Sequence, residues 1–277
     1  MPRFNIFALL SVVILCCLAS GQSPVAGDIQ SQQTTIVKRD PTALATLLRA
    51  VTAMGFTTTS SQITVRLTGS VAPVTESEGT PGNFISIVEL TDDGYQVRNE
   101  LEKAADGKRT VFVGSKNGAA FAYGHRVIKM SAHVSMVTAP SQMPVFELIR
   151  ALIKPRYKVN QVESRQIGRV SAVHVRISDE TDLVSKSVTP QDWYFDSATG
   201  LPLRWEFRVP DTFNGTPRTV VEGAKEFAKY QITNGVLLPL QITYFRSGRA
   251  INVTEIKSVE FNVPLSGSEF DLPKGAN

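Results

Sequence analysis

The sequence predicts an α+β protein, mainly antiparallel β, in which one long and highly curved sheet has helices in its concavity. Most of the chain after residue 62 alternates apolar and polar residues with the period of two that strands show. Asn-Gly and Asp-Gly dipeptides separate these stretches at intervals of about a dozen residues, as in a meander of antiparallel strands. Two amphipathic helical segments accompany the strands. A β-sandwich does not need such helices, so their presence favours the curved sheet over a sandwich.

Residues 1–21 are expected to be a secretory signal. Arg3 precedes an apolar run from Phe4 to Leu18, and three small residues follow, which is the order that signal peptides show. The run is short for a membrane-spanning helix, which usually needs ~20 residues, so a retained N-terminal anchor is the less favoured alternative. Both cysteines, Cys16 and Cys17, lie inside this run, and neither follows the small residue expected before a lipid-attached cysteine. We therefore expect a protein that is periplasmic or secreted and that folds without disulfides.

Residues 22–39, rich in Gln, Ser and Thr, are expected to be a flexible lead-in, and residues 40–277 to form one domain. A helix is predicted over residues 41–54, because Asp40 suits the N-cap, Pro41 suits the first helical position, and Gly55 ends the helix. Its apolar residues recur at helical spacing and predict one buried face: Leu44, Leu47, Leu48, Val51 and Met54.

A strand is predicted from Ile63 to Val71, and further strands over 83–90, 95–102, 108–114 and 119–124. Asp93-Gly94, Asp106-Gly107 and Asn117-Gly118 are expected to form the turns between them.

A second helix is predicted over residues 143–154, between Pro144 and Pro155, with an apolar stripe formed by Val145, Leu148, Ile149 and Leu152. Strands resume at 157–166 and 169–177, followed by a hairpin over 193–207 and strands near 220–232, 236–245 and 250–262. Asn234-Gly235 and Ser247-Gly248 are the expected turns. In the last strand the apolar phase slips between Val253 and Ile256, which predicts a β-bulge there.

No motif in the sequence predicts a catalytic, metal or cofactor site. His125, His133 and His174 stand in no nucleophile or zinc motif, and His174 is expected to be solvated on the polar side of its strand. The acidic stretch 179–182 is expected to be a solvated hairpin tip. A net charge of +4 without a basic, aromatic-rich run gives no support for nucleic-acid binding. We expect a protein that is not an enzyme; a hydrolase with a dispersed site is the less favoured alternative.

The segment 193–207 contains both tryptophans, and Asp196 lies between them. Asp196 is expected to begin a turn that Thr199 and Gly200 complete, because no second carboxylate or histidine stands nearby in the sequence. The flanking aromatic residues are either core or the lining of a groove, since two short helices leave part of so long a sheet uncovered. The residues expected to line that groove are Trp193, Phe195, Leu203, Trp205, Phe207, Leu238, Leu240, Ile242, Leu148 and Leu152.

The order of elements resembles the superfamily of LolA/LolB-like periplasmic lipoprotein carriers and their relatives in outer-membrane lipoprotein sorting. The resemblance covers roughly residues 40–273 and rests on YFDSATGLPLRWEF, EFAKYQITNGVLLPLQITYF, VEFNVPLSGSEFDLP and the strand-turn-strand FVGSKNGAAFAY. It implies an unclosed half-barrel whose helices plug the concave side and whose apolar interior accepts acyl chains. Two features of the superfamily lack a counterpart here: the Arg-Pro pair of an early strand, and the arginine through which carriers act, since Arg66 falls on the polar face.

The sequence and this resemblance together predict an exported protein that binds a lipid or a lipidated protein segment in a hydrophobic groove. A role in lipoprotein trafficking to the outer membrane, peripheral contact with the membrane and a partner protein in the envelope would follow. The alternative is an interaction or sensor module of the envelope that uses the same scaffold without a lipid cavity.

Overall fold

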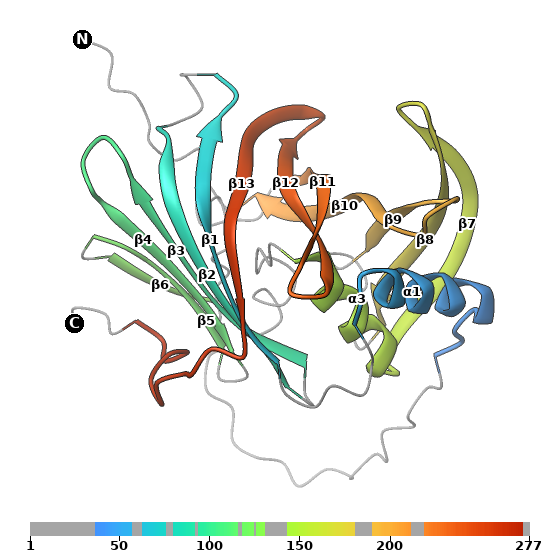
Figure 1. The fold of residues 1–277 in the computed structure, drawn as a ribbon, viewed down its shortest axis with the longest axis horizontal. Coiled ribbons are helices and arrows are strands. Elements are labelled where there is room, and N and C mark those ends of the chain that lie inside the picture. Colours follow the sequence, from blue (N-terminus) through green and yellow to red (C-terminus); the bar gives the residue numbers. More distant parts are fainter. Residues whose placement is uncertain are drawn as a thin grey trace, which may run out of the picture.

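The computed structural model describes residues 37–56, 63–75, 80–91, 94–115, 118–124, 126–130, 143–180, 190–211 and 219–273. Within these ranges the chain forms one antiparallel sheet of 13 strands that does not close into a barrel, and two helices lie on its concave side (Figure 1). The predicted fold class is therefore confirmed. The expected signal lies outside the described residues, as does the lead-in up to residue 36.

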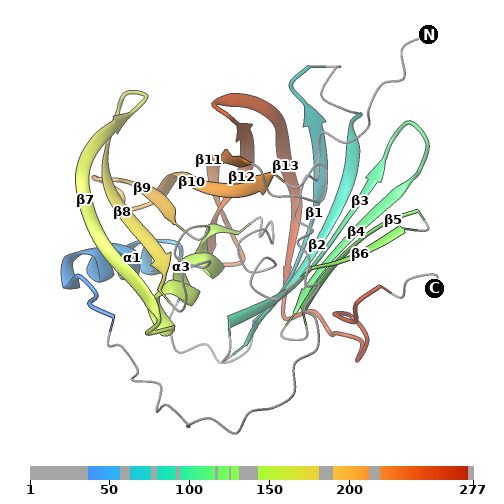
Figure 2. The same ribbon diagram turned by 180° about the vertical axis from the view of Figure 1, so that it is seen from behind.

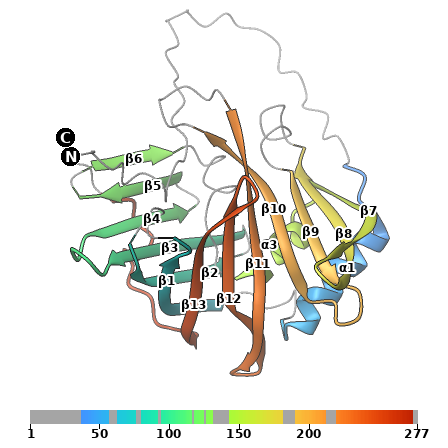
Figure 3. The same cartoon turned by 90° about the horizontal axis from the view of Figure 1, so that it is seen from above.

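The first arm of the sheet is a meander in chain order: β1 (Ile63–Pro73), β2 (Gly82–Thr91), β3 (Gly94–Lys103), β4 (Arg109–Ser115), β5 (Gly118–Tyr123) and β6 (Arg126–Met130). The second arm is also a meander: β7 (Tyr157–Ile167), β8 (Val170–Asp179), β9 (Gln191–Asp196), β10 (Pro202–Asp211), β11 (Thr219–Thr233), β12 (Val236–Arg246) and β13 (Arg249–Phe261). Pairing of β1 with β13 joins the two parts, which leaves β6 and β7 as the edges (Figure 3). Strand β6 was not predicted from the sequence.

The two helices are α1 (Pro41–Ala53) and α3 (Pro144–Ile153); α3 lies between the two arms of the sheet, and α1 lies beside β7 and β8 (Figure 2). The predicted cap of α1 is confirmed, because the Asp40 carboxylate accepts a hydrogen bond from the Thr42 amide at 2.8 Å. Leu48 differs from the prediction: it is 48% exposed, since the apolar face of α1 is narrower than the periodicity indicated. No helix in the described ranges is long and apolar enough to cross a membrane.

The irregularities of β13 lie on either side of the predicted bulge. The prediction of a bulge between Val253 and Ile256 was wrong, because the pairing of β13 with β1 is regular there. The register shifts only beyond Ile256, opposite Thr68 and Gly69. The apolar phase slips for another reason: the polar residues Asn252 and Thr254 are buried in this stretch. Buried polar residues therefore interrupt the apolar alternation of a strand in the same way as a bulge does.

The described part of the hydrophobic core is one cluster on the concave side of the sheet. It combines residues of both helices with residues of strands from both arms, from Val65 and Phe112 to Trp193 and Ile242. These core residues come from elements that lie far apart in the chain. A groove of the predicted kind would therefore lie on the concave face.

Candidate functional site

Most of the ten residues predicted to line a groove are members of this core. Those with an exposed fraction of 9% or less are Trp193, Phe195, Trp205, Phe207, Leu238, Ile242 and Leu148. Leu240 and Leu152 are partly buried and pack against the core. Leu203 is half-buried and sits where the register of β10 with β9 shifts, between Pro202 and Arg204. Nine of the ten thus belong to, or pack against, one hydrophobic core cluster.

Stacked aromatic rings form the centre of the concave face across β9, β10 and β11. Trp193 and Trp205, which are register partners, stack with ring centroids 5.0 Å apart and an interplanar angle of 7°. Trp193 also stacks on Phe227 of β11 at 6.2 Å, and Phe207 lies 4.6 Å from Trp205. The strand partner of Phe207 is Gly223, where a β-carbon would come within 2.7 Å of the Phe207 ring. The absence of a side chain at Gly223 therefore leaves the space that the Phe207 ring occupies.

Part of the apolar concave face is not fully covered. Five residues that pack against the core from four strands, β1, β3, β5 and β12, are only partly buried: Val71, Leu101, Phe121, Leu240 and Tyr244. Of these, Tyr244 stacks on the buried Phe207 ring, with centroids 6.3 Å apart. The acyl chain of a ligand could cover an apolar face that is partly exposed in this way.

Helix α3 places a charged pair inside the core. Glu147 and Arg150 form an ion pair of 2.6 Å, and their side chains are 1% and 5% exposed. Tyr95 of β3 donates a hydrogen bond to Glu147, and the Arg150 guanidinium lies 5.5 Å from the ring centroids of Tyr95 and Tyr157. Burial, together with the Glu147 charge, raises the pKa of Tyr95 well above its ordinary value. The amphipathic pattern did not reveal this pair, because a helix sunk into a concavity buries its polar face as well.

Lys225 of β11 is a second buried cation on the concave side. It is 5% exposed and lies between its strand partners Trp205 and Tyr244, with its ammonium 5.2 Å from the centroid of the Trp205 ring. Burial lowers the pKa of Lys225 to about 8, and the charge of Glu147 opposes this only in part. The sequence contained the signal: Lys225 alternates with Gly223 and Phe227 and so shares their face.

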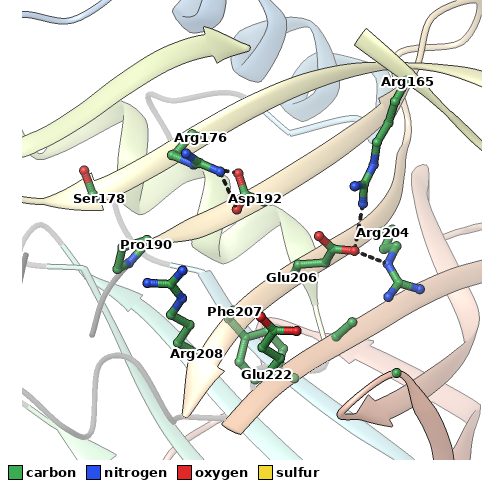
Figure 4. A pocket seen from close by; sticks show the side chains of 13 residues that line it. Arg165, Arg176, Ser178, Pro190, Asp192, Arg204, Glu206, Phe207, Arg208 and Glu222 are labelled. Carbon is green, nitrogen blue, oxygen red and sulfur yellow. Dashed lines mark hydrogen bonds and ion pairs between the residues drawn. The ribbon is translucent and has the colours of Figure 1, made fainter. Parts of the chain in front are cut away.

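The convex face carries a polar groove of about 490 Å³ (Figure 4). Its lining comes from β7, β8, β9, β10 and β11 and from the turn at Gly248. The charged residues that line it are Arg165, Arg176, Arg204, Arg208, Asp192, Glu206 and Glu222. In the part of the chain that the structure describes, no ion pair involves Arg208, which is exposed.

His174 lies beneath this groove and corrects the expectation that it is solvated. It is only 6% exposed, because its ring stacks on Tyr194 with centroids 4.5 Å apart and its Nε2 lies 2.6 Å from the Asp192 carboxylate. Arg176 donates two hydrogen bonds to the same carboxylate, at 2.8 and 3.1 Å. Burial alone would raise the pKa of Asp192, but the hydrogen bonds from Arg176 and His174 outweigh it and hold the pKa below its ordinary value.

A second carboxylate of the groove, Glu206, accepts hydrogen bonds from three side chains. Arg165 and Arg204 each donate to its Oε1 at 2.8 Å, and the Tyr194 hydroxyl donates to its Oε2 at 3.0 Å. Arg165 also lies 4.1 Å above the Tyr194 ring. The two carboxylates Asp192 and Glu206 are therefore each held by several donors.

The remaining predictions about acids have different outcomes. Asp196 begins a turn as predicted: its carboxylate accepts from the amides of Ala198 and Thr199 at 2.7 and 3.2 Å. Asp179 is not solvated, because it is 4% exposed and paired with Arg156 at 3.2 Å. The prediction placed Asp179 in a loop, whereas it is the last residue of β8 and is buried.

Several predicted positions lie outside the described residues. These are His125, His133, Thr181 and Asp182. In the described ranges no three residues of the types His, Cys, Asp and Glu group closely enough to hold a metal ion.

Comparisons with known proteins give matches in structure alone. Neither a protein-family profile nor a curated protein sequence matches the chain. A Vibrio parahaemolyticus domain named for outer membrane lipoprotein sorting superposes with a TM-score of 0.53 and 13% identity, covering 83% of this chain and 97% of that one. A LolA superfamily protein from Nitrosomonas europaea gives 0.52 and 11% identity, covering 82% and 96%. A DUF1329 family protein from Desulfovibrio piger gives 0.54 and 14% identity, covering 83% and 96%. The chain has the LolA-like fold that the sequence resemblance implied.

Proposed function

We propose that the chain is an exported, non-enzymatic binding protein that holds the acyl chain of a lipid or of a lipidated protein segment against its concave face. The observation that carries the proposal is that apolar residues packed against the core, among them Leu101, Phe121 and Tyr244, stay partly exposed, and that Tyr244 also stacks on the Phe207 ring. Each CH₂ group that leaves water contributes roughly 0.8 kcal/mol, so a modest length of chain suffices for useful affinity.

The two helices are the covers that a longer ligand would displace. Helix α3 meets the sheet through a buried ion pair, and such a pair generally stabilises packing less than apolar residues of the same volume. Helix α1 meets α3 and the edge strand β7, where the Asp40 amide donates to the Val159 carbonyl at 2.8 Å. Outward movement of α3 would therefore expose core residues that it packs against, such as Tyr95 and Phe56, without breaking a pair of strands.

The cellular setting of the proposal follows from the N-terminal sequence and from the fold. Export by residues 1–21 would place the domain of residues 40–277 in the periplasm or outside the cell, beside the membrane from which a lipid is taken. The fold is shared with a domain named for lipoprotein sorting to the outer membrane. This shared fold supports a role in lipoprotein trafficking as the finer form of the proposal.

Native mass spectrometry of the protein purified from membranes, followed by titration with a fluorescent fatty acid, tests the proposal. We expect a co-purifying mass and saturable probe binding. Leu101→Asn on the concave face should weaken probe binding by about tenfold, since it removes apolar contact that is worth more than 1 kcal/mol. Ile85→Asn on the neighbouring strand is the matched control, because Ile85 is 40% exposed and alternates onto the other face from Phe84. A clean apo mass without probe binding would overturn the proposal.

The convex groove favours a second candidate, an interaction module for another envelope protein. Arg208 is exposed at the groove, and three further arginines stand around it (Figure 4). Charged residues of this kind steer and orient a partner with acidic groups. Loss of a defined partner in Arg208→Glu, with fatty-acid binding absent from the wild type, would select this candidate over the first.

A further inference from the structure

We propose that the convex groove docks a segment of a partner protein in which an acidic side chain stands beside a basic one. Arg208 binds the acidic group of that segment, and Glu222 binds the basic group. The inference rests on the second candidate function, the interaction module, and adds to it the chemistry of the partner. It does not depend on the acyl-chain site, because Arg208 alternates with Phe207 along β10 and leaves the sheet on the other face.

The central charges of the groove are already engaged with one another. Asp192 and Glu206 are register partners, so two carboxylates stand directly opposite each other, an arrangement that repels unless cations surround it. Arg176 holds Asp192, while Arg165 and Arg204 each donate to Glu206. Three of the four arginines that line the groove therefore serve to hold its own carboxylates.

The next pair along the same two strands behaves differently. Arg208 and Glu222 are register partners on β10 and β11, and both are exposed and line the groove. Opposite charges at such positions commonly pair. In the described part of the chain, however, no ion pair involves either of them. Figure 4 shows Arg208 reaching toward Pro190, with no dashed line to Glu222. Each charge is thus available to a charge from outside.

A small residue makes the hollow into which a partner's side chain can enter. Ala224 alternates onto the same face of β11 as Glu222 and is the register partner of Glu206. It lines the groove among much longer side chains, and Gly248 lines it from the turn between β12 and β13. The resulting space of about 490 Å³ is bordered by both Arg208 and Glu222.

The charge of the lining favours a carboxylate with a neighbouring cation over a polyanion. Four arginines and three carboxylates line the groove, so one positive charge remains, which a single carboxylate neutralises. A guanidinium binds a carboxylate through two parallel hydrogen bonds. Glu222 repels a second anion and attracts an ammonium or guanidinium group instead. Residues two apart on an extended segment point to the same side and present such a pair.

Four extended peptides of one glycine-serine frame test the site by NMR titration of the full chain. Two positions of the frame, two residues apart, carry glutamate and lysine, glutamate and glutamine, glutamine and lysine, or two glutamines. We expect the glutamate-lysine peptide to bind at least fivefold more tightly than any other, with shifts centred on β10 and β11. Arg208→Glu should weaken its binding at least tenfold. Adding Glu222→Arg should restore it, because the pair is then present in the opposite order. Arg169→Glu, at an exposed turn outside the groove, is the matched control and should bind as wild type.

The remaining outcomes overturn the inference in distinguishable ways. Equal binding of the glutamate-lysine peptide by wild type and Arg208→Glu overturns the groove as the site and leaves the interaction module to another surface. Equal binding of the four peptides, or no saturable binding of any, overturns the proposed partner chemistry. Binding to vesicles of an anionic phospholipid that depends on Arg208, without peptide binding, assigns the groove to the membrane instead. Titration of the same samples with the fluorescent fatty acid decides the acyl-chain function separately, and Arg208→Glu should match wild type there.

Discussion

Lys225 faces Trp205 across the pairing of β10 with β11, with its ammonium 5.2 Å from the ring centroid, inside a core that is otherwise aromatic and aliphatic. The cost of this arrangement is the desolvation of the ammonium, which appears as a pKa lowered to about 8. The stability of the folded protein should therefore depend on the protonation of this one side chain.

The free energy of unfolding of the wild type should rise, relative to Lys225→Met, as the pH increases from 8 to about 10.5. Between these values the unfolded chain still carries the proton on Lys225 and the folded chain does not, so raising the pH favours the folded state. The relative gain should approach roughly 3 kcal/mol. Urea unfolding of both proteins across this range measures it; a difference that does not depend on pH would show that Lys225 titrates normally in the folded protein.

Replacement of one member of the α3 ion pair should be far more harmful than replacement of both. Glu147→Gln leaves the Arg150 charge buried without its counter-ion, so we expect a loss of about 3–5 kcal/mol in the free energy of unfolding. The double variant Glu147→Leu with Arg150→Met should be close to wild type or more stable. Chemical denaturation of Glu147→Leu, Arg150→Met and the double variant closes the cycle, and additive losses would contradict the prediction. If α3 is the displaced cover, the double variant should also take up the fatty-acid probe more slowly.

Asp192→Asn should lower the free energy of unfolding by about 2 kcal/mol at neutral pH. Its carboxylate is held by Arg176 and His174, which lower its pKa despite the burial that would raise it. The contribution is present above the unfolded pKa of ~3.9 and is lost as the pH falls through the lower pKa of the folded state. The two proteins should thus converge in acid. Glu163→Gln on β7, an exposed position, is the control and should match wild type at every pH.

Gly69→Ala should destabilise the seam that joins the two arms of the sheet. A β-carbon at Gly69 would lie 2.0 Å from the Glu255 carbonyl oxygen, which is backbone and cannot move aside cheaply. We expect a loss of about 3 kcal/mol or failure to fold. Gly267→Ala, which meets nothing within 4 Å, should remain within about 0.5 kcal/mol of wild type. Equal thermal stability of the two variants would show that the seam is more pliable than its geometry indicates.

Asp196→Ala and Asp196→Asn separate a turn residue from a catalytic acid. Asn preserves the acceptor for the amides of Ala198 and Thr199, so it should match wild type in stability, whereas Ala should lose about 1 kcal/mol. Neither variant should alter the binding of the fatty-acid probe. A loss of function in Asp196→Asn with stability unchanged would return Asp196 to the candidates for chemistry.

Local patterns in the sequence were sufficient for the elements and for much of their order. Alternation with a period of two placed twelve of the thirteen strands, and Asp40, Pro41 and Gly55 delimited α1, because each of these signals depends only on neighbours in the chain. Strand β6 was missed because five residues carry too short a pattern. The bulge in β13 was misplaced because buried polar residues at Asn252 and Thr254 disturbed the same pattern.

The sequence by itself thus determined the antiparallel meander, the two helices, the turn at Asp196 and the aromatic face of the hairpin. Only the tertiary structure decided which polar residues are buried: Glu147 and Arg150 inside the concavity, Lys225 against Trp205, and His174 beneath Asp192. The physical reason is that periodicity reports which side of an element a residue is on, whereas burial depends on what folds over that side. In this protein helices and neighbouring side chains cover both faces of the same strands, so the candidate site arises from contacts between residues far apart in the chain.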